Sequence, residues 1–396
     1  MENAKTLLSY YEQNKFNPVY IDVEDQEKWQ SHFLKRSNLY NNHLGVPLSL
    51  LKGVRLIEYG CNSGENALVF GLHGAKLTLV EPNENVHPRL KQLFGQFGLT
   101  ELIEELSTAG ITDYDSTTRF DLAVAEGFLF ALDDRDEALA KVVEIIRPGG
   151  LGIISFNDRI GCMIEVTKRA LLARCCQLAG VDRQSDESTG LAYQLFGEDF
   201  KRLNASRSFK AWWKDTLVNP FLDYDKLWSY QEIVPQLAEQ GCEILGTSPV
   251  WMTSHTFNWY KNAVDSHTRL DHFFDDLKTA FPYLLTGYKP QSKQYRQPED
   301  SLVNTVLTFI EQLSSFAELR QTEFSLISYP EQLTEYVRSL EDRRFDDFFD
   351  QFNDLIRLMK EAEQVSDLLI GYSNKSHIRN AWGSPYHYFS FIKASY

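Results

Sequence analysis

Residues 54–68 read Val-Arg-Leu-Ile-Glu-Tyr-Gly-Cys-Asn-Ser-Gly-Glu-Asn-Ala-Leu, and this stretch decides the fold of the chain. Its apolar start predicts a buried strand that ends at the acid Glu58. Gly60 and Gly64 follow, and residues 65–70 predict the first turns of a helix. Glycine lets a backbone approach a ligand, and a helix N-terminus offers unpaired N–H groups to an anion. The stretch therefore predicts a ligand-binding loop between a strand and a helix.

The glycine spacing distinguishes two kinds of cofactor loop. A dinucleotide-binding loop needs Gly-x-Gly-x-x-Gly, but Asn62 stands at the middle glycine position. This departure disfavours an NAD-dependent oxidoreductase. The pattern that is present is Glu58-x-Gly60-x-x-x-Gly64.

A second predicted strand, residues 75–80, ends at Glu81-Pro82-Asn83. An acid at the end of the second strand of a doubly wound sheet lies beside the first loop, within reach of a ribose. Because two neighbouring hydroxyls can donate to one carboxylate, we expect Glu81 to bind ribose. The alternative is a solvated acid at a strand end.

Three further strands complete the predicted parallel sheet. The third lies near residues 102–106 and the fourth at residues 120–125, before Glu126. A helix over residues 134–146 is then followed by Arg147-Pro-Gly-Gly150 and a fifth strand at residues 151–156.

Together, the Glu-x-Gly-x-x-x-Gly loop, the acid after the second strand and the Arg-Pro-Gly-Gly turn resemble class I S-adenosylmethionine-dependent methyltransferases. The resemblance implies a Rossmann-like, doubly wound α/β sheet of seven strands with an antiparallel last strand. It also implies S-adenosylmethionine as cofactor, with the turn after the third strand walling the adenine. The cofactor-binding residues that it implies are Tyr40, Glu58, Gly60, Cys61, Asn62, Gly64, Glu81, Pro82, Gly110, Ile111, Ala125 and Glu126.

Residues 1–50 are aromatic and predict a helical lid. In many class I enzymes an N-terminal helix closes over the cofactor, where the ring of Tyr40 could face the sulfonium through a cation–π contact. The alternative is that Tyr40 only packs the helix down. This segment and residues 64–67 also resemble a bacterial methyltransferase subgroup associated with surface-glycan gene clusters.

Residues 161–227 leave the minimal fold as a helical insertion. Within it, Trp213, Asp215 and Asn219 belong to an element that resembles a Trp-x-Asp-x-x-x-Asn-Pro segment of the same subgroup. Stacking faces and paired polar groups would suit a sugar-like substrate. The alternative is a packed helix that is broken at Pro220.

The sixth predicted strand covers residues 242–248. The segment that follows it is rich in aromatic residues and contains His255. A loop there can overhang a reaction centre, so His255 is a candidate base, although a structural histidine is the alternative. The last predicted strand, residues 384–393, runs antiparallel and would bring His387 to the active-site edge as a substrate-binding residue.

This reading divides the chain into a core with two insertions. The lid at residues 1–50 precedes the core, which consists of residues 51–160, 228–252 and 383–396. The two insertions are residues 161–227 and a helical cap at residues 253–382. An apolar stripe in the cap, which includes Phe345 and Phe352, predicts either the inner face of the cap or a homodimer surface.

We expect methyl transfer to a small-molecule or sugar-like acceptor at oxygen. Glu126, Asp158 and His255 are the candidate catalytic residues. The chain lacks the Asn/Asp-Pro-Pro-Tyr/Phe motif of many amino-group methyltransferases. Phe130-Ala131 stand where many small-molecule enzymes carry Glu-His. A purely positional mechanism, in which the protein aligns the acceptor without a catalytic base, therefore stays open. A protein side-chain methyltransferase and a non-catalytic cofactor-binding regulator also stay open. No metal-ligand set is evident.

The amino-acid composition limits the classes of partner that the protein can bind. A net charge of −15 and a pI near 5.1 argue against nucleic acids and anionic membranes as partners. The chain shows no signal peptide and no membrane span, and its five cysteines have neither zinc spacing nor a disulfide framework. We therefore expect a reduced, cytoplasmic protein.

Overall fold

The computed structural model describes residues 6–14, 20–203, 207–251, 261, 265–289 and 296–395. The chain forms two compact units. The first comprises Met1–Phe156, Trp228–Thr253 and His387–Tyr396, and the second comprises Asn157–Leu227 and Ser254–Tyr386.

The first unit is built on a seven-stranded sheet with the strand order β3-β2-β1-β4-β5-β7-β6. Its strands are β1 (Arg55–Tyr59), β2 (Lys76–Val80), β3 (Ile103–Ser107), β4 (Phe120–Ala125), β5 (Ile146–Asn157), β6 (Cys242–Ser248) and β7 (Tyr386–Lys393). Its longer helices are α1 (Leu7–Asn14), α2 (Gln26–Asn38), α3 (Glu65–Leu72), α4 (His87–Gln96), α5 (Arg135–Ile145) and α9 (Tyr230–Glu239). Its short helical turns are η1 (Leu39–His43), η2 (Leu48–Leu50), η3 (Glu84–Val86), η4 (Thr100–Leu102) and η5 (Leu129–Ala131).

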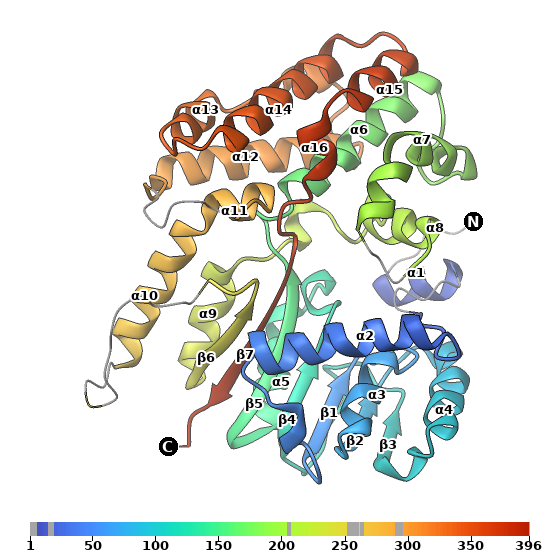
Figure 1. The fold of residues 1–396 in the computed structure, drawn as a ribbon. Helices are drawn as coiled ribbons and strands as arrows, with labels where there is room; N and C mark the ends of the chain where they lie inside the picture. The colour runs from blue at the N-terminus through green and yellow to red at the C-terminus, as the bar shows by residue number, and fades with distance from the viewer. Residues whose placement is uncertain are drawn as a thin grey trace. The chain divides into compact units, whose positions relative to one another are not determined.

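The sheet has the predicted mixture of strand directions. The strands β1 to β5 pair in parallel, whereas β6 and β7 pair antiparallel. In Figure 1 the red strand β7, although last in the sequence, lies between β5 and β6. The predicted doubly wound, seven-stranded class with an antiparallel last strand is therefore confirmed.

Strands β1, β2 and β4 end level with one another at the edge that carries the predicted cofactor residues. Tyr59 pairs with Val80 on one side and with Ala125 on the other. Four consecutive residues of β1 and of β2 are buried, which is typical of a parallel strand covered on both faces. The register therefore brings Glu58, Glu81 and Glu126 to one end of the sheet.

The boundary between α5 and β5 differs from the sequence prediction. Strand β5 begins at Ile146, so the Arg-Pro-Gly-Gly segment lies within the strand instead of before it. The pairing of β4 with β5 is irregular here, and a Cβ at Gly150 would lie 3.0 Å from the Asp121 carbonyl oxygen, so glycine permits this close approach.

The second unit consists of helices. They are α6 (Met163–Ala179), α7 (Asp186–Arg202), α8 (Phe209–Trp212), α10 (Ser266–Thr279), α11 (Phe281–Thr286), α12 (Asp300–Ala317), α13 (Glu331–Arg338), α14 (Arg343–Glu361), α15 (Val365–Ser373) and α16 (Ser376–Asn380). Short turns are η6 (Trp213–Leu217), η7 (Tyr224–Lys226) and η8 (Phe324–Leu326).

The apolar stripe of α14 packs inside the second unit. Phe345, Phe348, Phe352 and Met359 are buried in the same apolar core as residues of α6 and α12. The inner-face prediction is confirmed, and the stripe is not free to form a homodimer surface.

All five cysteines are buried and unpaired. Within the described ranges, no helix has both the length and the apolar character needed to cross a bilayer.

Candidate functional site

The loop after β1 has the backbone shape that its glycines predict. Gly60 and Gly64 have φ of +65° and +87°, and Asn62 also has a positive φ of 49°. Gly64 is the N-cap of α3, so the loop leads directly into a helix N-terminus. A Cβ at Gly60 would lie 2.7 Å from the ring of Phe128, so this glycine accommodates both the turn and a neighbouring aromatic ring.

Glu81 joins this loop to the end of β2. Its carboxylate accepts the Asn62 N–H at 2.7 Å and the Asn83 N–H at 2.9 Å. Burial raises the pKa of Glu81, and the two backbone donors oppose that rise. Each carboxylate oxygen keeps acceptor capacity, so the side chain can still receive hydrogen bonds from a ligand.

Glu58 is the second acid at this edge, and it is more strongly perturbed. Burial raises its pKa to about 8, the nearby Glu126 carboxylate adds to the rise, and Arg36 opposes it. The Oε2 atom of Glu58 is buried and has no hydrogen-bond partner among the described residues. A buried carboxylate without a full set of partners is costly, and a ligand cation would relieve that cost.

Glu126 is the third acid, and it lies directly after β4. Its carboxylate accepts a hydrogen bond from Arg36 Nη2 at 2.5 Å and another from the Tyr40 hydroxyl at 3.0 Å. Arg36 also donates to Tyr40, and its guanidinium lies 4.7 Å from the centre of the Tyr40 ring. Tyr40 is fully buried and already makes a cation–π contact with Arg36.

Arg36 is the residue of this cluster that sequence reasoning missed. It lies on α2, four residues before Tyr40, so both side chains project from one face of the helical segment. The four-residue spacing between Arg36 and Tyr40 was the sequence feature that could have predicted this pairing. A buried guanidinium that is paired with Glu126 and close to Glu58 is well suited to bind a carboxylate, because its fork of N–H donors matches two oxygens.

The other predicted cofactor residues lie near the same strand ends. Cys61 is buried, and burial raises its pKa well above the usual value, so it remains a neutral thiol. Ala125 ends β4 and is buried. Pro82 follows Glu81, while Gly110 and the buried Ile111 come after β3, where the Gly110 carbonyl accepts the Tyr114 N–H.

Four predicted residues lie in the second unit. Asp158 accepts the Gly161 N–H at 2.7 Å, and Asp215 pairs with Arg207. Trp213 and Asn219 are buried. However, the indole N–H of Trp213 and the amide nitrogen of Asn219 have no hydrogen-bond partner within the described part of the chain.

The two predicted histidines have different outcomes. His255 lies outside the described residues. His387 is completely buried at the start of β7, where its ring centre lies 5.3 Å from that of Trp251 and 5.6 Å from those of Phe156 and Tyr230. The structure thus assembles His387 into an aromatic cluster.

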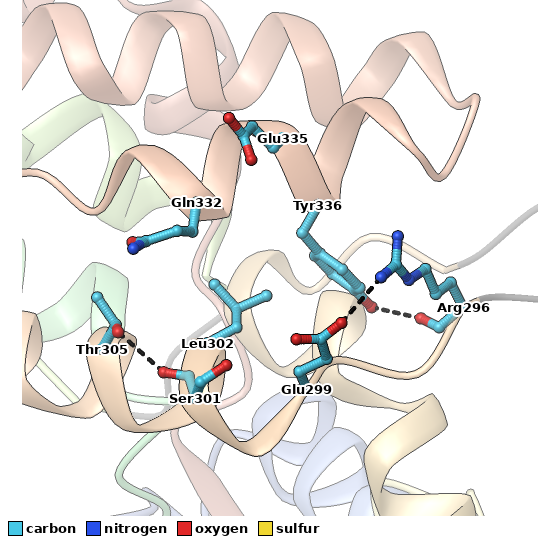
Figure 2. Close-up of a pocket in the computed structure, with 8 residues that line it drawn as sticks. All are labelled: Arg296, Glu299, Ser301, Leu302, Thr305, Gln332, Glu335 and Tyr336. Carbon is cyan, nitrogen blue, oxygen red and sulfur yellow. Dashed lines mark hydrogen bonds and ion pairs between the residues drawn. The ribbon is translucent and has the colours of Figure 1, made fainter.

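A surface pocket of about 210 Å³ lies between α12 and α13 of the second unit (Figure 2). Arg296 and Glu299, which both line it, pair at 3.0 Å, and the Tyr336 hydroxyl donates to the Arg296 carbonyl at 2.9 Å. Both charged side chains of this pair are largely exposed to solvent. None of the predicted site residues lines this pocket.

The acid-rich edge of the first unit, with its glycine loop, is thus the better candidate site. Residues 29–215 match a family model described as a methyltransferase domain. This part of the chain, just under half of its length, is therefore similar to a methyltransferase domain. No curated protein sequence matches the chain.

Solved structures that are similar to this chain share little sequence with it. An S-adenosylmethionine-dependent methyltransferase from Clostridium acetobutylicum ATCC 824 is 17% identical, covering 33% of this chain and 51% of that chain, with a TM-score of 0.27. The N-methyltransferase NodS from Bradyrhizobium japonicum WM9 is 19% identical over 35% of this chain and 74% of that chain, with a TM-score of 0.28. The [4+2]-cyclase SpnF is 11% identical over 92% of this chain and 82% of that chain, with a TM-score of 0.38. The present chain therefore spans about half the length of the Clostridium protein.

Proposed function

We propose that this protein transfers the methyl group of S-adenosylmethionine to an oxygen atom of a sugar-like small molecule. The observation that carries the proposal is the buried set of acids at the ends of β1, β2 and β4, with Arg36 among them. Such a set can bind a ligand that presents an ammonium, a carboxylate and two neighbouring hydroxyls.

Each group of the cofactor has a fitting partner in this set. Glu58, with its unpartnered Oε2, suits the ammonium group, and Arg36 suits the carboxylate. Glu81 suits the ribose hydroxyls, since its oxygens can accept further hydrogen bonds. The bound cofactor supplies an electrophilic methyl group on a sulfonium, so the protein mainly has to align the acceptor and exclude water.

The hydroxyl-bearing acceptor is supported by two unpartnered donors of the second unit. Trp213 and Asn219 each bury an N–H group that has no acceptor among the described residues. Buried donors are normally hydrogen-bonded, so these two favour a ligand that is rich in acceptor oxygens. Asp215, although paired with Arg207, can still accept a hydrogen bond from a ligand hydroxyl.

A hydroxyl nucleophile needs a group that takes its proton. Glu126, directly after β4, is a carboxylate in the acidic cluster and is our first candidate. Asp158 is held in a turn by the Gly161 N–H and is a weaker candidate, while His255 stays a prediction. A base within hydrogen-bond reach of the reacting hydroxyl typically contributes a factor of about 10² to 10⁴ in rate.

A methyl-transfer screen tests the proposal. The purified protein is incubated with S-adenosylmethionine that carries a radioactive methyl group and with panels of sugars, nucleotide sugars, amines and proteins. We expect label in an alkali-stable ether of a hydroxyl-bearing small molecule. Label in a protein or an amine would reject the proposed acceptor.

Cofactor binding is measured separately by calorimetry with S-adenosylhomocysteine. Binding without transfer to any acceptor in the panels would favour a cofactor-binding regulator over an enzyme. Absence of binding would reject the cofactor assignment of the acidic cluster.

A further inference from the structure

Lys168 is a buried lysine of the second unit that has no part in the cofactor site. It lies on α6 with an exposed fraction of 1%, and its Nζ atom has no hydrogen-bond partner among the described residues. This atom lies 3.3 Å from the centre of the Trp382 ring and 3.8 Å from a carboxylate oxygen of Asp199. Lys168 therefore lacks what a buried ammonium normally requires, which is acceptors for its N–H groups.

The carboxylate of Asp199 is shared between Lys168 and two other basic side chains. It accepts hydrogen bonds from Arg379 at 2.9 Å, from Arg202 at 3.1 Å and from the Tyr372 hydroxyl at 2.6 Å. Three cations on one buried carboxylate would leave an excess of positive charge, which is costly where water is excluded. Because an arginine stays protonated in proteins, only Lys168 can remove this excess by giving up a proton.

This cluster joins four helices of the second unit. Lys168 comes from α6 and Asp199 from α7. Their partners Tyr372, Arg379 and Trp382 come from α15, from α16 and from the segment directly after α16. The helices α15 and α16 are thus held on α6 and α7 at the position of the buried lysine, and their detachment would expose Lys168 to water.

We propose that Lys168 is the proton-sensitive element of a latch, in which α15 and α16 close over an uncharged amine and open as that amine takes up a proton. The Trp382 ring attracts an ammonium, but one ring replaces only part of the hydration that a buried ammonium loses. Opening restores that hydration, so acidification favours the open form. The latch acts on the stability of the second unit and does not depend on methyl transfer.

The charges that face Lys168 determine the pH range of the latch. Burial lowers the pKa of Lys168 to about 7, Asp199 and Glu165 oppose this shift, and the two arginines add to it. The usual pKa is 10.5, so the closed form binds fewer protons than the open form between these two values. The stability of the closed latch is therefore lowest below pH 7 and rises as the pH rises from 7 towards 10.5.

Two other groups around Lys168 have shifted pKa values, and neither changes its charge substantially between pH 8 and pH 9. Burial raises the pKa of Glu165 to about 7, so this acid is largely ionised at pH 8. Burial also raises the pKa of Tyr372 well above its usual value, so its hydroxyl stays protonated. This pH interval therefore isolates the proton of Lys168.

Hydrogen exchange of the full chain at pH 8 and pH 9, corrected for the intrinsic exchange of an unstructured chain, measures the opening equilibrium of residues 365–382. We expect the opening constant of the parent to fall about tenfold from pH 8 to pH 9, because the open form binds one more proton. Lys168→Met should show no such fall. Lys201→Met, which removes an exposed lysine of α7, is the matched control and should retain it.

A fall of equal size in Lys168→Met would assign the proton to another group and overturn the latch. An unchanged opening constant in the parent would overturn it as well. If Lys168→Met does not fold, NMR of the parent protein labelled at the lysine Cε carbons decides. One lysine that titrates near pH 7 would support the latch, whereas titration of every lysine near 10.5 would refute it.

Discussion

The backbone N–H of Asn62 donates a 2.7 Å hydrogen bond to the carboxylate of Glu81. This bond ties the loop after β1 to the end of β2, so that a ligand held by one strand is also placed against the other. Asn62 has a positive φ of 49°, which aims its N–H at the acid. The residue that departs from the dinucleotide-loop pattern therefore has a structural role in the turn.

We expect Glu81→Ala to weaken S-adenosylhomocysteine binding about tenfold or more, because hydrogen bonds to charged groups contribute about 1.5–3 kcal/mol. The change also removes the acceptor of two backbone N–H groups, so some loss of thermal stability should accompany it. Calorimetry measures the affinity, and Glu84→Ala, three residues away and exposed, is the control. Unchanged affinity would remove Glu81 from the site.

Gly60→Val should abolish cofactor binding while the sheet still folds. A side chain at this position meets both a φ of +65° and the ring of Phe128, so the loop has to shift. Gly53→Val is the matched control, because Gly53 has a φ of +78° but no atom within 4 Å of an added Cβ. The control should be destabilised by about 1–2 kcal/mol through backbone strain and should bind normally. Normal binding by Gly60→Val would show that the cofactor does not use this loop.

Gly64→Val should also abolish binding, for a related reason. Gly64 is the N-cap of α3 with a φ of +87°, and an added Cβ would lie 3.0 Å from Leu90. The substitution therefore displaces the helix N-terminus that the cofactor is expected to approach. Calorimetry with S-adenosylhomocysteine gives the readout, and circular dichroism checks that the fold is retained. Wild-type affinity would contradict the prediction.

The pKa of Glu58 predicts a pH-dependent stability. Its folded-state pKa of about 8 is above the usual 4.5, so the folded protein binds more protons than the unfolded chain between these values. The stability contribution of Glu58 is therefore intact below pH 4.5 and is lost as the pH rises to 8. Glu58→Gln should be more stable than the parent at pH 9, by about 2–4 kcal/mol, and similar to it at pH 4. Urea denaturation at both pH values measures this, and a difference that does not change with pH would contradict it.

Substitution of Asp199 should strongly destabilise the second unit. It is fully buried and accepts hydrogen bonds from the Tyr372 hydroxyl at 2.6 Å, Arg379 at 2.9 Å and Arg202 at 3.1 Å. Asp199→Asn leaves these cations without their counter-charge and should cost about 3–5 kcal/mol. Glu198→Gln, next in sequence but exposed and paired with Lys201, should change the free energy of unfolding far less, because exposed ion pairs contribute little. Equal free energies of unfolding for the two variants would refute the argument.

Once an acceptor is identified, Asp215→Ala and Asn219→Ala should retain cofactor affinity and lose turnover. Neither residue belongs to the unit that carries the acidic cluster. His255→Ala should also lose turnover and, for a hydroxyl acceptor, should change the pH profile most. Parent rates in all three variants would reject these residues as the acceptor site.

The sequence by itself determined the first unit in considerable detail. Strand β6 has the predicted ends, and β2 and β4 differ from prediction by at most one residue, because short apolar runs bounded by Gly, Pro and acids depend on local chemistry. The resemblance to class I methyltransferases also predicted the antiparallel β7. The glycine loop and the position of Glu81 followed from the same local patterns.

Only the tertiary structure decided which side chains meet at the ends of the strands. Arg36 and Glu126 are 90 residues apart and come together because α2 and the end of β4 converge, which no local pattern reveals. The same holds for Asp199, whose partners Tyr372 and Arg379 come from the far end of the chain. Local propensity and periodicity decide where helices and strands form, whereas the burial of opposite charges depends on packing between segments that are remote in sequence.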